Sequence, residues 1–83
     1  MPNLPLLRQK ARLAIHNGTL PSRRANSTRG GPGSGGVCSV CGLPARASMT
    51  ELEIEFLRDT GVGPPVIYRL HHRCFAAWEL ERG

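Results

Sequence analysis

Three cysteines and one histidine form two close pairs in this chain. The first pair is Cys38-x-x-Cys41, the second is His71-x-x-Cys74, and 29 residues separate the two pairs. Two thiolates can reach one metal ion across a turn of two residues, and Gly42 permits the backbone to bend beneath that ion. Residues three apart on a helix share a face, so the second pair suits the first turn of a helix. The spacing predicts one structural zinc ion in a tetrahedral Cys3His site.

Other chemistry for these residues fits less well. A disulfide with one free thiol is a common arrangement of three cysteines, but an odd count without a secretion signal argues against it. An iron–sulfur cluster normally takes four cysteines, and a catalytic cysteine–histidine pair needs supporting groups that the sequence does not offer. Four protein ligands leave no open position on zinc for a catalytic water. We therefore expect no enzymatic activity and no small-molecule substrate.

The sequence offers two histidines for one ligand position, because His71 and His72 are adjacent and both precede Cys74. The helical pitch favours His71. His72 would lie two residues before Cys74, about 200° away around the helix axis. We expect His72 to be exposed or to support the site from outside, and it stays open as the alternative ligand.

Charge is distributed unevenly along the 83 residues, whose formal net charge is +5. Residues 1–50 contain no Asp or Glu, whereas residues 37–83 hold six acids against five arginines. A basic segment without acids is typical of a surface that contacts phosphates or an acidic protein, although it also suits a merely solubilising tail. We expect nucleic acid, with DNA favoured, or an acidic protein as the partner. The basic residues expected to neutralise phosphates are Arg8, Lys10, Arg12, Arg23, Arg24 and Arg29.

Composition and periodicity divide the chain into three segments. Residues 1–18 predict a basic amphipathic helix, with Asn3 as its N-terminal cap and Gly18 as its stop. This helix either docks on the rest of the protein or orders only against a partner. Residues 19–36 are rich in Pro, Ser, Arg and Gly and predict a flexible linker, and residues 37–83 form the zinc-binding module. The apolar positions of the helix are Leu4, Leu7, Ala11, Ala14 and Ile15.

The zinc-binding module has the pattern of two strands and a helix. Residues 51–57 alternate charged and apolar side chains, which predicts a strand with one buried face, and residues 66–70 predict an antiparallel partner strand. Residues 72–81 predict the C-terminal helix. The expected fold is a small metal-stabilised α+β domain, in which a zinc knuckle, a β-hairpin and this helix follow the N-terminal helix and the linker. The side chains expected in the core are Leu52, Ile54, Phe56, Phe75, Trp78 and Leu80.

Three glutamates, Glu51, Glu53 and Glu55, share the opposite face of the first predicted strand. Their mutual repulsion requires a basic partner, and Arg69 on the neighbouring strand is the nearest candidate. Evenly spaced carboxylates on an open strand favour a solvated face over a catalytic pair. Two alternatives remain open. This face or the N-terminal helix could dock a partner in an adaptor role, or the basic N-terminal segment could fold onto the glutamates.

The order of knuckle, hairpin and helix resembles a treble-clef zinc finger. Over residues 38–75 the ligand spacing, with Phe75 directly after the last ligand, is similar to that of poly(ADP-ribose) polymerase-type zinc fingers, and LIM half-sites share the His-x-x-Cys-Phe ending. The first resemblance implies binding to DNA ends or distorted DNA. The segment between the ligand pairs departs from that family, since it carries the three glutamates where basic residues are expected.

A second resemblance spans most of the chain. Leu20-Pro21, the Gly-Gly-Pro-Gly-Ser-Gly segment, Cys-x-Val-Cys-Gly and residues 73–79 together look like a group of small uncharacterised bacterial zinc-finger-like proteins. This likeness implies no established activity.

No apolar run reaches 18 residues, so we expect no transmembrane helix and no membrane partner. The apolar run of residues 4–7 is too short for a secretory signal, and a cytoplasmic location is expected. Because the first 36 residues are arginine-rich and free of acids, a mitochondrial presequence is a second interpretation.

Overall fold

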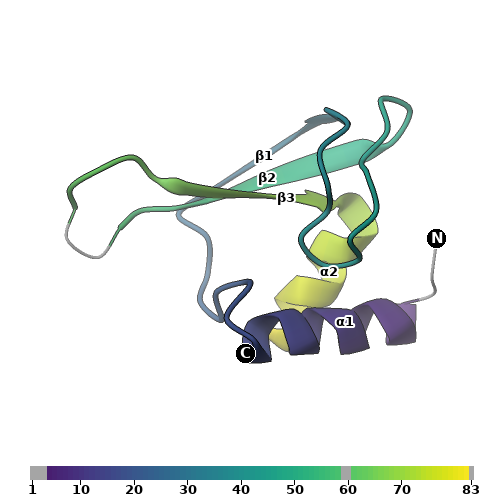
Figure 1. Ribbon diagram of the computed structural model, residues 1–83, viewed down its shortest axis with the longest axis horizontal. Coiled ribbons are helices and arrows are strands. Elements are labelled where there is room, and N and C mark those ends of the chain that lie inside the picture. Colours follow the sequence, from purple (N-terminus) through teal and green to yellow (C-terminus); the bar gives the residue numbers. More distant parts are fainter. Residues whose placement is uncertain (1–3, 59–60, 83) are drawn as a thin grey trace.

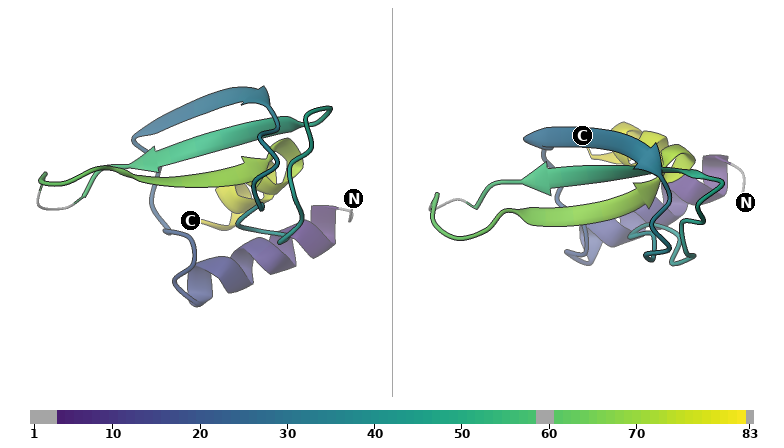
Figure 2. Two further views of the ribbon diagram at one scale, coloured as in Figure 1. Left: turned by 45° about the horizontal axis from the view of Figure 1, so that its top comes forward. Right: turned by 90° about the horizontal axis from the view of Figure 1, so that it is seen from above.

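The computed structural model describes residues 4–58 and 61–82. The strands form one antiparallel sheet in the order β1-β2-β3, with both helices on the same side of it (Figures 1 and 2). Helix α2 lies against the sheet, and α1 packs against α2, so the chain is a small α+β domain. The elements are α1 (Leu4–His16), β1 (Ser27–Pro32), β2 (Thr50–Phe56), β3 (Val66–His71) and α2 (His72–Glu81).

Helix α1 docks on the rest of the protein, which answers the question that the sequence left open. Its residues Leu7, Ala11 and Ala14 are buried, at the spacing expected for one helical face. The two alanines have side chains small enough to bring α1 close to α2, where Ala77 is also buried. Gly18, with φ of 79°, follows the helix end as predicted. The predicted cap Asn3 lies outside the described residues.

Two arginines of α1 bond to the last residue of α2. Arg8 Nε donates to one carboxylate oxygen of Glu81 at 2.7 Å, and Arg12 Nε donates to the other at 2.9 Å. The bonds from Arg12 and Arg8 hold the pKa of Glu81 below its usual value. The ion pairs therefore join the middle of α1 to the C-terminal end of α2, beside the buried alanines Ala11, Ala14 and Ala77.

Strand β1 corrects the expectation of an irregular linker over residues 19–36. Its six residues pair with β2 in antiparallel register, from Ser27 opposite Glu55 to Pro32 opposite Thr50. Five of the six are exposed. The strand is therefore held by backbone hydrogen bonds to β2 and not by burial of a side-chain face, which is the signal that an alternating sequence pattern would have given.

Gly33, directly after β1, brings the backbone against the loop that follows the first cysteine pair. A Cβ at this position would clash with the carbonyl oxygens of Ala45 and Arg46. The Gly33 amide donates to the Met49 carbonyl at 2.9 Å, and the Gly35 amide donates to the Ala45 carbonyl at 2.8 Å. The glycine-rich segment thus lies in direct backbone contact with the loop that follows the first cysteine pair.

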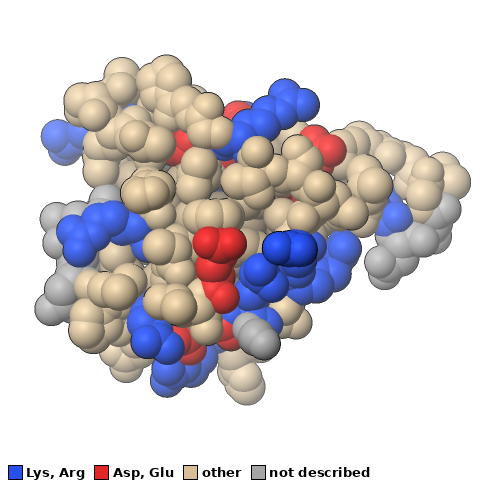
Figure 3. Space-filling model, turned by 180° about the vertical axis from the view of Figure 1, so that it is seen from behind, with Lys and Arg blue, Asp and Glu red and all other residues tan. Residues whose placement is uncertain are grey.

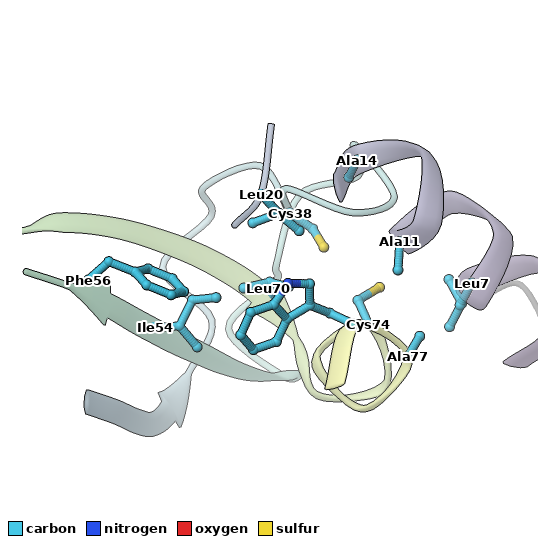
Figure 4. Close-up of a cluster of buried hydrophobic side chains, with 11 residues drawn as sticks. Leu7, Ala11, Ala14, Leu20, Cys38, Ile54, Phe56, Leu70, Cys74 and Ala77 are labelled. Carbon is cyan, nitrogen blue, oxygen red and sulfur yellow. The ribbon is translucent and has the colours of Figure 1, made fainter. Parts of the chain in front are cut away.

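The core lies between the sheet and the two helices. Figure 4 shows Ile54, Phe56 and Leu70 of the sheet on one side and Cys74 of α2 beside Ala11 of α1 on the other. Ile54 and Phe56 are buried as predicted, and Leu52 is half-buried.

The two apolar residues predicted for the last turns of α2 differ in burial. Trp78 is 1% exposed and packs edge-to-face on Phe56, with ring centroids 6.1 Å apart. Its indole N–H donates to the Pro21 carbonyl at 2.9 Å, so Trp78 belongs to the core as predicted. The prediction for Leu80 is wrong, since this side chain is 55% exposed. It lies two residues beyond Trp78, on a different side of the helix.

Neither described helix is long and apolar enough to cross a membrane. Helix α1 has 13 residues and α2 has 10, against the roughly 20 that a bilayer requires.

We expect Gly33→Ala to lower the free energy of unfolding of the metal-loaded protein by about 1–3 kcal/mol, because the added methyl group must displace the backbone at Ala45 and Arg46. Gly31→Ala is the matched control, since a Cβ there meets no atom within 4 Å. It should change the free energy of unfolding by no more than about 0.5 kcal/mol. Denaturant unfolding followed by circular dichroism measures both variants. Equal stability of the two would contradict the close approach at Gly33.

Candidate metal centre

The two ligand pairs meet in one place. The ligand atoms of Cys38, Cys41, His71 and Cys74 all lie within 4.8 Å of one another. His71 Nδ1 is 3.3 Å from the sulfur of Cys41 and 3.8 Å from the sulfur of Cys74. In a tetrahedral zinc site with metal–sulfur bonds of about 2.3 Å, neighbouring ligand atoms are about 3.7 Å apart. The donor set and its dimensions therefore fit a single metal ion of this size.

The first pair sits in a tight turn. The Gly42 amide donates to the Cys38 carbonyl at 3.0 Å, and Gly42 has a φ of 75°, in the left-handed region that favours glycine. The amide of Val40 lies 3.4 Å from the Cys38 sulfur, to which it donates. An isolated antiparallel bridge between Val37 and Pro44 closes the turn. The backbone thus bends under the two sulfurs as the sequence predicts.

The second pair lies where β3 becomes α2. His71 is the last residue of the strand and caps the helix in an extended conformation, with φ of −64° and ψ of 154°. Cys74 follows in the first helical turn. His71 Nε2 is 3.1 Å from the Pro44 carbonyl oxygen. A carbonyl can only accept, so Nε2 carries the proton and the Nδ1 lone pair points towards the sulfurs, as a metal ligand requires.

The structure places His71, and not His72, beside the three cysteines. His71 is 2% exposed and faces the sulfurs, whereas its neighbour His72 is exposed. His72 is therefore not one of the four converging residues.

The three cysteines are all free, so no disulfide joins them. The side-chain hydrogen bond with Cys74 lowers the pKa of the Cys38 thiol to about 4, with further help from backbone amides. The same bond and burial raise the pKa of Cys74. Cys38 and Cys74 thus lie within hydrogen-bond reach of each other. Three thiolates there would repel one another, and a divalent cation would remove that repulsion.

The glutamate face differs from the prediction at one residue. Arg69 does lie opposite the glutamates, with its guanidinium 3.6 Å from Glu51 and 3.4 Å from Glu53. Glu51, however, is only 4% exposed, and it accepts hydrogen bonds from the Ser34 amide at 3.2 Å and the Ser34 hydroxyl at 2.9 Å. A fully solvated glutamate face is therefore wrong. The sequence missed Ser34 because it lies in the glycine-rich segment, 17 residues away.

The six basic residues predicted to contact phosphates lie on several elements. Arg8 and Arg12 are paired with Glu81, and Arg23 lies over the Phe56 ring, 5.0 Å from its centroid. In Figure 3, Lys and Arg side chains form several groups on one face of the molecule, with acidic side chains between them. The remaining three are Lys10 on α1, Arg24 before β1, and Arg29 on β1.

Comparison of the chain with models of protein families, with curated proteins and with solved structures gives no match. The resemblances to poly(ADP-ribose) polymerase-type zinc fingers and to small bacterial zinc-finger-like proteins therefore stay predictions.

We expect His71→Ala to lose the bound metal and His72→Ala to keep one metal ion per chain. Structural zinc contributes apparent free energies of roughly 10–16 kcal/mol in small modules, comparable to the whole stability of a domain. His71→Ala should therefore also unfold, and wild type should unfold with a strong chelator. Native mass spectrometry and circular dichroism measure the two effects. Metal loss in His72→Ala with retention in His71→Ala would overturn the ligand assignment.

Proposed function

We propose that the protein is a non-enzymatic structural zinc-binding domain of the treble-clef type that binds nucleic acid, with the cytoplasm as its expected location. The observation that carries the structural role is the convergence of four protein ligands, three of them buried. Four ligands complete a tetrahedral zinc shell and leave no position for a substrate or an activated water. A zinc ion there would act by joining the knuckle to the β3–α2 junction.

The charge of the folded chain supports nucleic acid as the partner. Arg8 and Arg12 share one carboxylate, so this group keeps a net positive charge. Arg23, Arg24 and Arg29 are exposed. With a formal net charge of +5 on 83 residues, the protein attracts polyanions over the distance of a Debye length. Phosphate contacts of this kind give affinity with little sequence preference.

The rival role is a protein-interaction adaptor, and each of the two surfaces expected for it is partly engaged within the fold, although Leu4 on α1 and Glu53 on β2 keep exposed area. The apolar face of α1 is buried against α2 through Leu7, Ala11 and Ala14. On the glutamate face, Glu51 is bonded to Ser34 and Arg69. A partner would have to displace these contacts or use other residues, so nucleic acid is the proposal that fits the fold better.

We expect the zinc-loaded protein to bind a fluorescent DNA oligonucleotide with a strong dependence on salt. The slope of log affinity against log salt concentration should lie between about −3 and −5. The shallower slope is expected for single strands, which have a lower counterion density, and if only four basic residues contact phosphates. The steeper slope is expected for duplex DNA if Arg8 and Arg12 contact phosphates as well. Fluorescence anisotropy at several salt concentrations measures it. No binding at low salt, or a slope near zero, would remove nucleic acid as the partner.

Glu81→Gln should increase the affinity for DNA, because it removes the carboxylate that holds Arg8 and Arg12 and adds one unit of net positive charge. The slope against salt should become steeper by up to about two units as the two arginines reach phosphates. Glu79→Gln is the matched control, since it changes the charge equally on the same helix but Glu79 makes no ion pair with a described residue. Equal effects of the two variants would show that Arg8 and Arg12 act only through net charge.

A further inference from the structure

A groove of about 380 Å³ lies under the part of the sheet that extends beyond α2. Figure 1 shows the β2–β3 hairpin reaching past both helices on this side. The groove is lined by the end of β2 at Phe56, the start of β3 at Val66 and Tyr68, and the segment before β1 at Arg23. Phe56 and Val66 are paired across the two strands, and Tyr68 follows on the same face. The groove is therefore built on rigid strands, with one wall from the segment that precedes β1.

Two arginines line this groove, and each is fixed by a backbone carbonyl. A terminal nitrogen of Arg23 donates to the Leu57 carbonyl at 3.2 Å, with the guanidinium over the Phe56 ring. Arg58 Nε donates to the Pro64 carbonyl at 2.8 Å. A guanidinium has five N–H donors, so these bonds orient both side chains without exhausting them. Among the described residues, no carboxylate lines the groove. A phosphate is the anion that such a pair suits.

An aromatic ring lies beside the two guanidinium groups. Tyr68 is half-buried, and its ring meets Phe56 edge-to-face, with centroids 5.8 Å apart. Unpaired nucleobases stack on partly exposed aromatic side chains of this kind, whatever the base. Bases within a duplex are already paired and stacked, so they cannot enter a groove of this size. One unpaired nucleotide has a phosphate at one end and a base at the other. Two arginines that can donate hydrogen bonds to the phosphate, next to an aromatic ring on which the base can stack, match these two ends.

We propose that this groove binds one nucleotide of single-stranded nucleic acid, with the phosphate on Arg23 and Arg58 and the base against Tyr68. The inference rests on the proposed nucleic-acid function and adds to it a preference for single strands. Arg23 thereby has a specific phosphate-binding role. Arg58 and Tyr68 are further contact residues, which the charge pattern of the N-terminal half does not indicate. The volume of the groove lies within the range of small-ligand sites.

The test uses the full zinc-loaded chain with a labelled oligothymidine strand and with a duplex of the same length. Tyr68→Leu keeps an apolar side chain but removes the ring, and it should weaken single-strand binding about five- to 100-fold. Tyr68→Phe keeps the ring and should bind like wild type. Neither variant should change duplex binding by more than about twofold. Fluorescence anisotropy measures affinity, and thermal unfolding confirms that each variant is folded.

A second comparison tests the phosphate contact without touching the core. Arg58→Gln should weaken single-strand binding several-fold more than Arg73→Gln, which removes the same charge from an exposed position on α2 outside the groove. The proposed nucleotide site is overturned if Arg58→Gln and Arg73→Gln weaken single-strand binding equally. It is also overturned if Tyr68→Leu weakens the binding of single strands and of duplex equally, or weakens neither. If the wild-type protein binds neither the single strand nor the duplex, the proposed nucleic-acid function itself is wrong.

Discussion

The constraint on which the rest of the structure depends is the closure of two ligand pairs, 29 residues apart, onto one small volume. Cys38 and Cys74 are members of the same buried cluster as Leu7, Ile54 and Trp78. The ligand cluster is thus part of the hydrophobic core. A chain of this length buries only a modest apolar area, so a metal bound at its centre would contribute directly to folding. Without a cation, the core would have to accommodate the sulfurs of Cys38 and Cys74 against each other.

The loop that carries the first cysteine pair is held by hydrogen bonds to β3 and to the glycine-rich segment. The Ser39 amide donates to the Arg69 carbonyl of β3 at 2.9 Å, and the Gly35 amide donates to the Ala45 carbonyl at 2.8 Å. The Pro44 carbonyl accepts a hydrogen bond from His71 Nε2. None of these contacts depends on the identity of an apolar side chain. They explain why a segment without a hydrophobic pattern, residues 33–36, lies against the site instead of only leading to it.

What the sequence revealed and what it concealed differ in physical kind. The ligand pairs, the bounds of α2 and the inward positions Ile54 and Phe56 follow from spacing and periodicity, which are local properties of the chain. Strand β1, the burial of Glu51 and the hydrogen bond from His71 to Pro44 instead arise where distant segments meet. Each is made by backbone groups, or by small side chains in a glycine-rich segment. Such contacts leave no repeating signal in a sequence.

The basic N-terminal half is built into the fold, and this changes how it would meet a partner. A disordered basic tail must lose conformational entropy when it binds, whereas a folded surface has already done so. One chain of contacts links the candidate metal centre to the segment that carries Arg23. Trp78 follows Cys74 by one helical turn, and its indole N–H holds the Pro21 carbonyl, two residues before Arg23. A metal that held Cys74 would therefore be linked, through Trp78 and Pro21, to the segment that places Arg23 over Phe56. Under the proposed function, metal and nucleic acid would therefore act on the same folding equilibrium.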